Sequence, residues 1–221
     1  MKPIIISVIN HKGGVGKTTT TVNISAGLAK LGKKVLTIDL DTQMNLTHSL
    51  IGDLDEKEIN ITEAILNDKI SLKDIIKPTL VDNLQIAPSG ESMIDLDLKL
   101  HSCPIRREYK LKDALKNDLI SEYDFILIDN PPYISFTTVN SLIASNYYLV
   151  PVSAEYLPLV GIRHLIKTIE LIKPSNPSIS NLGYLLTMVN RRESISSGVE
   201  NILRGTFPED MFENVIRFIR S

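Results

Sequence analysis

Apolar runs alternate with helix-like patterns along the whole chain. Six short and continuously apolar runs predict β-strands, at residues 4–9, 34–39, 84–88, 125–129, 147–152 and 183–189. Continuous hydrophobicity is typical of strands that are buried on both faces. Between the last two runs, apolar residues recur at helical spacing from Leu165 to Ile172, and Pro174 ends that helix. The pattern therefore predicts an α/β fold, a doubly wound and mainly parallel sheet with helices on both faces.

The stretch between the second and third predicted strands has a different character. Residues 53–83 are richer in charge, and we expect them to form short helices outside the sheet. A length of 221 residues favours a single domain spanning 1–221, and the chain shows no repeat, low-complexity tract or clear linker.

Composition narrows the class of protein. Hydrophobic residues make up 43% of the chain and charged residues 23%, which is ordinary globular usage, and the net charge of −2 alone indicates neither nucleic-acid nor membrane binding. Cys103 is the only cysteine, which excludes an intramolecular disulfide and a cysteine-held metal cluster within one subunit. No run approaches the roughly 20 apolar residues of a membrane-spanning helix. The six-residue apolar run after Met1-Lys2-Pro3 is too short for a signal peptide, so we expect a cytoplasmic protein.

A glycine-rich loop follows the first predicted strand. Residues 10–19 read Asn-His-Lys-Gly-Gly-Val-Gly-Lys-Thr-Thr, which fits the P-loop pattern G-x-x-x-x-G-K-[ST], and a helix is expected over residues 18–31. Such glycines let successive backbone N–H groups point inward at a phosphate. Lys17 is expected to reach the β- and γ-phosphates and Thr18 to bind magnesium. The predicted nucleotide-binding residues of this loop are Gly13, Gly14, Val15, Gly16, Lys17, Thr18 and Thr19.

Acidic residues end two of the predicted strands. Asp39 ends the second strand and Asp41 follows it, and Asp129 closes the fourth after four apolar residues. In open α/β sheets, ligands bind beyond the carboxyl ends of the strands, beside the P-loop. A single acid at such a place can also be a helix cap or a turn residue. The P-loop in the same sheet favours a magnesium role for Asp129, the arrangement of a Walker B carboxylate.

The loop contains a second lysine, Lys12, directly before Gly13. With it, residues 12–19 resemble the deviant Walker A box of the ParA/MinD family of ATPases. The resemblance implies that Lys12 crosses a dimer interface to the partner subunit's nucleotide, as both a nucleotide-binding and a catalytic residue. Cations between two facing nucleotides would offset their repulsion. An extra lysine is otherwise a solvated surface charge.

Residues 39–47 resemble the D-x-D-P-Q-x-N-x-T switch of the ParA/Soj partition ATPases. The resemblance implies that Asp41 orients or activates the attacking water near the magnesium ion and that Asp39 supports it. Thr42 stands where the family usually has proline, and Met44 where glycine is common. These departures leave both carboxylates in place.

Weaker matches extend the resemblance over residues 3–220. Residues 124–132 look like the family's D-Y-x-x-I-D-x-P-P block with Asn130 in an unusual place, and residues 150–156 like its P-V-x-x-E-Y segment. Asn190 lies where the family reads adenine, although it could equally be a turn residue. Residues 215–220 look like I-P-R-x-V-R with Ile216 replacing proline. Family members usually continue past this point, so we expect Ser221 to mark a boundary short of the usual C-terminal extension.

The resemblance implies a ParA/Soj-type ATPase for plasmid or chromosome segregation that uses ATP and magnesium. ATP is expected to close a homodimer that binds DNA without sequence preference, and a ParB-like partner to stimulate hydrolysis. The protein would then be nucleoid-associated, with no membrane partner. Arg191, Arg217 and Arg220, in an arginine-rich C-terminal stretch, are the expected DNA contacts, although ion pairs on a helix surface would explain the same charges.

Other classes share the P-loop. A MinD-like division-site ATPase would need a C-terminal amphipathic membrane helix, which the sequence does not show, and a nitrogenase-type iron protein would need two cluster cysteines. A nucleotide-binding scaffold without turnover would lack an acid such as Asp41. A positioning ATPase for another cargo would carry every motif above and differ only in its adaptor, so this alternative stays open.

Overall fold

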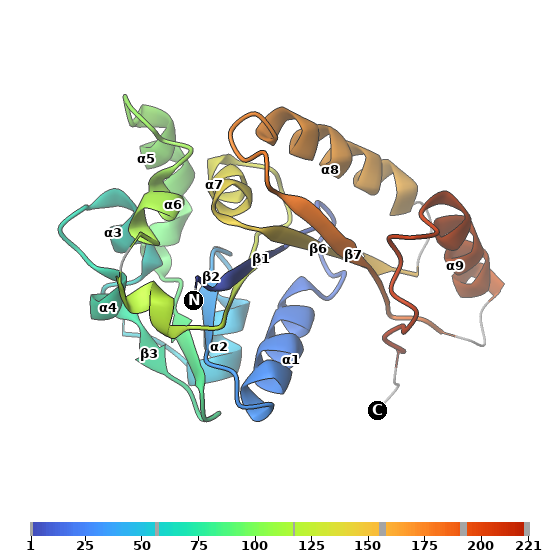
Figure 1. The fold of residues 1–221 in the computed structure, drawn as a ribbon, viewed down its shortest axis with the longest axis horizontal. Helices are drawn as coiled ribbons and strands as arrows, with labels where there is room; N and C mark the ends of the chain where they lie inside the picture. Colours follow the sequence, from blue (N-terminus) through green and yellow to red (C-terminus); the bar gives the residue numbers. More distant parts are fainter. Residues whose placement is uncertain (1, 56–57, 117, 155–157, 191–193, 219–221) are drawn as a thin grey trace.

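A mainly parallel, seven-stranded sheet forms the centre of the protein in the residues that the computed structural model describes, namely 2–55, 58–116, 118–154, 158–190 and 194–218 (Figure 1). The strand order is β3-β4-β2-β5-β1-β6-β7, and only β3 runs antiparallel to its neighbour. The strands span β1 (Ile4–Val8), β2 (Val35–Asp39), β3 (Lys77–Pro78), β4 (Leu84–Ala87), β5 (Phe125–Asp129), β6 (Tyr147–Ser153) and β7 (Ser180–Thr187). This arrangement confirms the predicted fold class.

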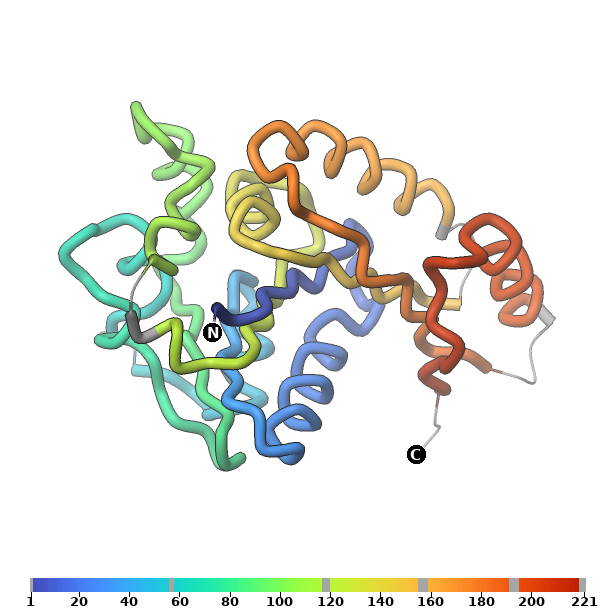
Figure 2. Tube along the Cα trace, in the orientation of Figure 1, coloured from blue at the N-terminus to red at the C-terminus, as the bar shows by residue number. Residues whose placement is uncertain are grey.

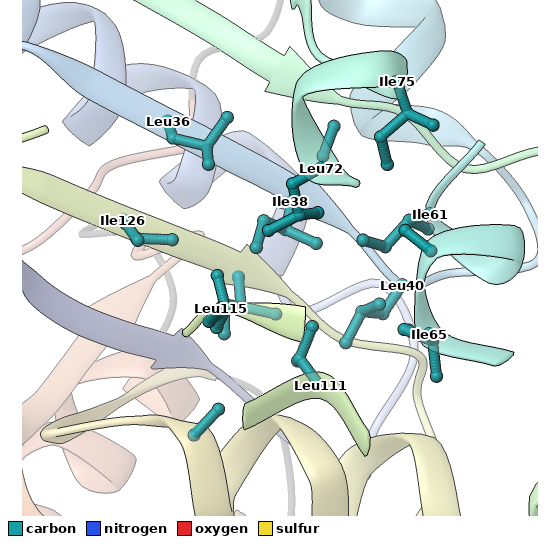
Figure 3. Close-up of a cluster of buried hydrophobic side chains, with 14 of the residues drawn as sticks. Leu36, Ile38, Leu40, Ile61, Ile65, Leu72, Ile75, Leu111, Leu115 and Ile126 are labelled. Atoms are coloured by element: carbon teal, nitrogen blue, oxygen red, sulfur yellow. The ribbon is translucent and has the colours of Figure 1, made fainter. Parts of the chain in front are cut away.

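Helices cover both faces of the sheet. They span α1 (Lys17–Lys30), α2 (Asn45–Ile51), α3 (Ile61–Leu66), α4 (Leu72–Ile75), α5 (Leu96–Ser102), α6 (Lys110–Ala114), α7 (Phe136–Ala144), α8 (Pro158–Ile172) and α9 (Ser194–Thr206), with two 3₁₀ turns at Glu91–Asp95 and Asp118–Glu122. Apolar residues of α1 and α2 pack on one face, whereas α3 to α8 pack on the other. Figure 3 shows part of the hydrophobic core on this second face, where Leu36, Ile38 and Ile126 of the sheet pack against short helices.

The C-terminal segment runs along the outer edge of β7 (Figure 2). Backbone N–H groups of Tyr184, Ile216 and Phe218 donate to the carbonyls of Asp210, Leu186 and Val189, at 2.8, 2.8 and 3.1 Å. Gly183 permits this close approach. Its φ is 145°, and a Cβ there would lie 2.7 Å from the Phe212 ring.

The charged stretch 53–83 follows the prediction in part. It contains the short helices α3 and α4, both with Asn or Ser capping boxes, but it also contributes β3 to the sheet, which the sequence did not predict. Pro78 suits this place, because proline lacks an N–H and is tolerated on an edge strand. None of the helices in the described ranges is long and apolar enough to cross a membrane.

Candidate nucleotide site

The glycine loop lies between β1 and α1 and is held by the neighbouring strands. Gly14 and Gly16 have φ angles of 70° and 86°, a region that favours glycine. The Thr187 hydroxyl of β7 donates to the Val15 carbonyl at 2.8 Å. The Asn10 side chain donates to the Pro151 carbonyl at 2.7 Å and accepts from the Lys12 N–H at 3.0 Å. The loop is therefore positioned from both β6 and β7 before any ligand binds.

The N-terminus of α1 opens at this loop. Gly16 is its N-cap, no side chain caps it, and its first turn contains no acidic residue. The first N–H groups of a helix lack partners within the helix, and they attract anions together with the helix dipole. The arrangement fits the phosphate site that the sequence predicts for Gly13 to Thr19.

Lys17 lies inside the loop, whereas Lys12 lies at its exposed rim. Lys17 is 6% exposed, and its Nζ donates to the Lys12 carbonyl at 3.3 Å. Burial lowers the pKa of the Lys17 ammonium, and the nearby Asp129 and Asp41 carboxylates partly oppose that change. A buried cation within a cradle of backbone N–H groups fits a polyphosphate, which would replace the carbonyl as its partner.

Asp129 lies at the end of β5, within hydrogen-bond distance of α1. The Thr18 hydroxyl donates to its Oδ2 at 2.6 Å. Burial raises the pKa of Asp129 to about 7, with Asp39 adding to the rise and Thr18 and Lys17 opposing it. A hydroxyl and a carboxylate this close are oxygen ligands of the kind magnesium prefers, so Thr18 and Asp129 fit the predicted metal site.

Asp39 and Asp41 form a buried network with α2 and the end of β4. Asp39 accepts from the Asp41 N–H at 3.0 Å and, through its other oxygen, from the N–H and hydroxyl of Thr47 at 2.9 and 2.8 Å. Burial raises the pKa of Asp39 to about 6, and these hydrogen bonds oppose the rise. The Asp41 carboxylate accepts from the Gln43 N–H at 3.0 Å. Asp39 thus fixes the backbone that presents Asp41.

Met44, the N-cap of α2, has a φ of 52° in the left-handed region. Met44 therefore replaces the family's common glycine at a position where glycine would be unstrained. A left-handed backbone conformation typically costs a non-glycine residue about 1 kcal/mol or more. The strained residue lies directly in the switch segment.

Sequence reasoning missed two polar residues that support the site, Ser89 and Asn130. The Ser89 hydroxyl donates to the Asp41 carbonyl at 2.9 Å, and its N–H donates to the Thr47 hydroxyl at 3.0 Å. Asn130 is fully buried and donates to the Ser7 hydroxyl at 2.9 Å and to the Val8 carbonyl at 3.0 Å. Their position just after a strand end was the signal that could have identified Ser89 and Asn130.

An apolar cavity of about 250 Å³ adjoins the glycine loop. It is lined by residues of α1, the end of β7 and the C-terminal segment, including Gly16, Thr19, Met188, Ile216, Arg217 and Phe218. Asn190, the predicted adenine reader, is not among its lining residues; its backbone N–H donates to the Ser196 hydroxyl at 3.3 Å. Met188, Ile216 and Phe218 give this cavity an apolar surface, which suits packing against a nucleotide base.

The arginines predicted to bind DNA are in different situations. Arg191 and Arg220 lie outside the described residues. Arg217 is exposed and lines the cavity beside the glycine loop. Arg204, in the same arginine-rich stretch, pairs with Glu200 at 2.9 Å and donates to the carbonyls of Phe212 and Glu213 at 3.2 and 3.0 Å. Arg204 therefore anchors the C-terminal segment to α9.

The raised carboxylate pKa values predict an unusual pH dependence of stability. Folding moves the pKa of Asp129 from 3.8 to about 7, so the folded state holds protons that the unfolded chain has released. In the absence of ligand, the free energy of unfolding should therefore fall as pH rises from about 4 to about 7, by at most about 1.4 kcal/mol per pH unit for this group. Asp129→Asn should flatten the dependence in denaturant titrations across that range. Equal slopes for the variant and the parent would contradict the assignment.

The fold and the loop define a P-loop ATPase. Residues 3–181 match the family described as an AAA domain. The chain is 38% identical over 213 residues to the chromosome partitioning protein ParA of Myxococcus xanthus, which covers 96% of this chain and 74% of that protein. It is also 38% identical over 213 residues to the sporulation initiation inhibitor protein Soj of Bacillus subtilis, with 96% and 83% covered. The chain belongs to the ParA/Soj family of partition ATPases.

A solved structure extends the likeness to a bound ligand. The crystal structure of cobyrinic acid a,c-diamide synthase from Mycobacterium smegmatis with bound ATP analogue and magnesium superposes with a TM-score of 0.91. It is 30% identical and covers 99% of this chain and 88% of that one. Nucleotide and magnesium thus occur together on this fold.

Proposed function

We propose that the protein is a ParA-type ATPase that segregates a plasmid or a chromosome. The observation that carries this is the juxtaposition of the P-loop with three buried carboxylates at the strand ends, Asp39, Asp41 and Asp129. ATP would close two copies into a homodimer that binds DNA without sequence preference. A ParB-like partner would stimulate hydrolysis and release the DNA, so the ATP-bound protein would be nucleoid-associated.

Each residue of the nucleotide site is proposed to contact a different part of the bound nucleotide, its metal or the attacking water. Lys17 and the N–H groups of the loop from Gly13 to Thr19 hold the phosphates. Thr18 and Asp129 hold magnesium, with Asp41 beside them, and the metal supplies charge neutralisation at the phosphates when it is bound. Asp41 positions the attacking water. Asn190 would contact the base, and the apolar cavity beside the glycine loop would pack against it.

Lys12 is proposed to act on the partner subunit's nucleotide. Lys12 is exposed at the rim of the loop, and its backbone carbonyl accepts a hydrogen bond from Lys17. A side chain at the rim can extend away from the protein, whereas the Lys17 side chain is buried inside the loop. The exposed lysine therefore suits a role between subunits.

The function is tested by Lys12→Ala, with Lys33→Ala at the far end of α1 as the matched control. ADP affinity should be retained, because Lys12 does not serve its own phosphates. Dimerisation with a non-hydrolysable ATP analogue should weaken by roughly tenfold or more, the loss of one charge-assisted contact. Light scattering measures the dimer, and DNA retention should fall in parallel. A normal dimer from Lys12→Ala would return this lysine to the class of surface charges.

DNA contact is proposed for Arg191, Arg217 and Arg220. The described part of this stretch supports only Arg217 as an exposed cation, because Arg204 is engaged in anchoring. Positioning of another cargo by the same cycle remains the second candidate function, since it would use the same nucleotide site with a different adaptor.

A further inference from the structure

A basic segment lies in and between α5 and α6. Residues 99–116 contain six lysines and arginines but two acids, a net of +4 in a chain whose net charge is −2, so the remainder carries −6. The six are Lys99, Arg106, Arg107, Lys110, Lys112 and Lys116. Figure 1 shows α5 and α6, which carry this segment, on the far side of the molecule from α9.

The segment borders a hollow of about 510 Å³ between α6 and the α3–α4 loop. Four cationic residues line it, Lys69, Arg106, Lys110 and Lys116, against two acids, Asp68 and Asp113. Asp113 accepts from Arg106 at 2.9 Å and from Lys116 at 2.7 Å, and Lys110 lies 3.5 Å from Asp68. Each carboxylate offsets one charge, so the hollow keeps a net of +2. Such exposed pairs are weak and can exchange a carboxylate for a phosphate.

Two arginines of the basic segment, Arg106 and Arg107, are held in place by aromatic rings. Arg106 has a φ of 55°, which is unusual for a residue other than glycine. Its guanidinium lies 4.9 Å from the centre of the Tyr109 ring. Arg107 lies 4.8 Å from the Phe136 ring and donates to the His101 carbonyl at 3.2 Å. A fixed backbone and stacked side chains reduce the conformational entropy that these arginines lose when a ligand binds.

The basic segment is also fixed to α7, the helix that follows the Asp129 loop. The Asn140 side chain of α7 donates to the Arg107 carbonyl at 2.8 Å and accepts from the Leu111 N–H at 3.1 Å. These two hydrogen bonds join the backbone beside the hollow to α7, which follows the nucleotide site in sequence.

We propose that this basic hollow, between α6 and the α3–α4 loop, binds the phosphate backbone of double-stranded DNA. The inference rests on the proposed DNA binding and gives it a second location. Clustered Arg and Lys match a uniform polyanion, which needs no side-chain pockets. A lipid surface fits less well, because a single large aliphatic side chain of residues 99–116, Ile105, is exposed, whereas Leu100, Leu111 and Leu115 are buried in the core.

The test is the double variant Lys69→Glu with Lys116→Glu. The matched control, Lys167→Glu with Lys173→Glu, makes the same charge change on exposed residues of and beside α8. Binding of a fluorescent duplex of arbitrary sequence is measured with ATP analogue across a salt series. The hollow variant should bind roughly tenfold or more weakly, with a salt slope smaller by about 1 to 2, while the control stays near the parent. Thermal midpoints check folding, and Lys69→Gln with Lys116→Gln is the milder alternative.

The outcomes separate this inference from the proposed function. If the parent binds DNA and the hollow variant matches the control, the hollow is not the site. If Arg217→Glu alone removes all binding, the site is C-terminal. Loss of binding to phosphatidylglycerol vesicles, with DNA binding intact in the same variant, would make the surface a lipid site and overturn the proposal. If the parent binds no DNA at any salt concentration, the proposed DNA binding fails, and this inference with it.

Discussion

Asp41→Ala should slow ATP turnover by roughly ten- to a thousandfold while ATP affinity stays within a few-fold of the parent. Asp41 follows the carboxyl end of β2 and is 6% exposed. Asp39 and Ser89 hydrogen-bond its backbone, and the Gln43 N–H donates to its carboxylate. Removing a group that orients water raises the barrier without removing ground-state contacts to the phosphates. ATP-bound protein should therefore persist as a locked dimer.

Phosphate release and nucleotide titration measure the two quantities separately. Asp53→Ala is a matched control, because it removes an exposed carboxylate from the far end of α2, where Asp53 pairs with His48 at 2.9 Å. Its turnover should stay near that of the parent. Parent-like turnover from Asp41→Ala would show that another group positions the water.

Lys17→Ala should weaken ATP binding by roughly 10- to 150-fold, the range expected for one hydrogen bond between charged groups at about 1.5–3 kcal/mol. The ligand-free variant should be no less stable than the parent, because burial lowers the pKa of Lys17 and so marks a cost of keeping it charged in the fold. Loss of affinity without loss of stability separates a binding role from a structural one.

Lys30→Ala is the control for this prediction, since Lys30 is exposed in the last turn of the same helix. Titration with a fluorescent ATP analogue gives the affinities, and denaturant unfolding gives the stabilities. Unchanged affinity in Lys17→Ala would remove this lysine from the nucleotide site.

The strands were predictable because their hydrophobicity is continuous. Runs such as 125–129 are buried on both faces, and their burial shows in the sequence without knowledge of the neighbours. The fold class and the ParA/Soj resemblance are confirmed. The strand order was not predicted, because the apolar pattern of a central strand does not say which strand lies beside it. β3 was missed because two residues carry no periodicity.

The site was predictable where one motif holds all its parts. Residues 12–19 form one loop, so their proximity follows from the chain itself. Asp39 and Asp129 are 90 residues apart in sequence but directly paired in the register of β2 and β5. Ser89 could not be tied to Asp41 before the place of β4 beside β2 was known. The roles of these residues in binding and turnover remain predictions that the variants above address.

The two edges of the sheet are both blunted. On one side β3 is two residues long and contains Pro78, and on the other side the segment 210–218 covers β7. An open strand edge invites other chains to add on by backbone pairing, which leads to fibres rather than defined assemblies. Copies of this protein therefore have little opportunity to join edge to edge. Self-association is left to side-chain contacts between helices and loops, where assembly can be reversible and depend on what the loops hold.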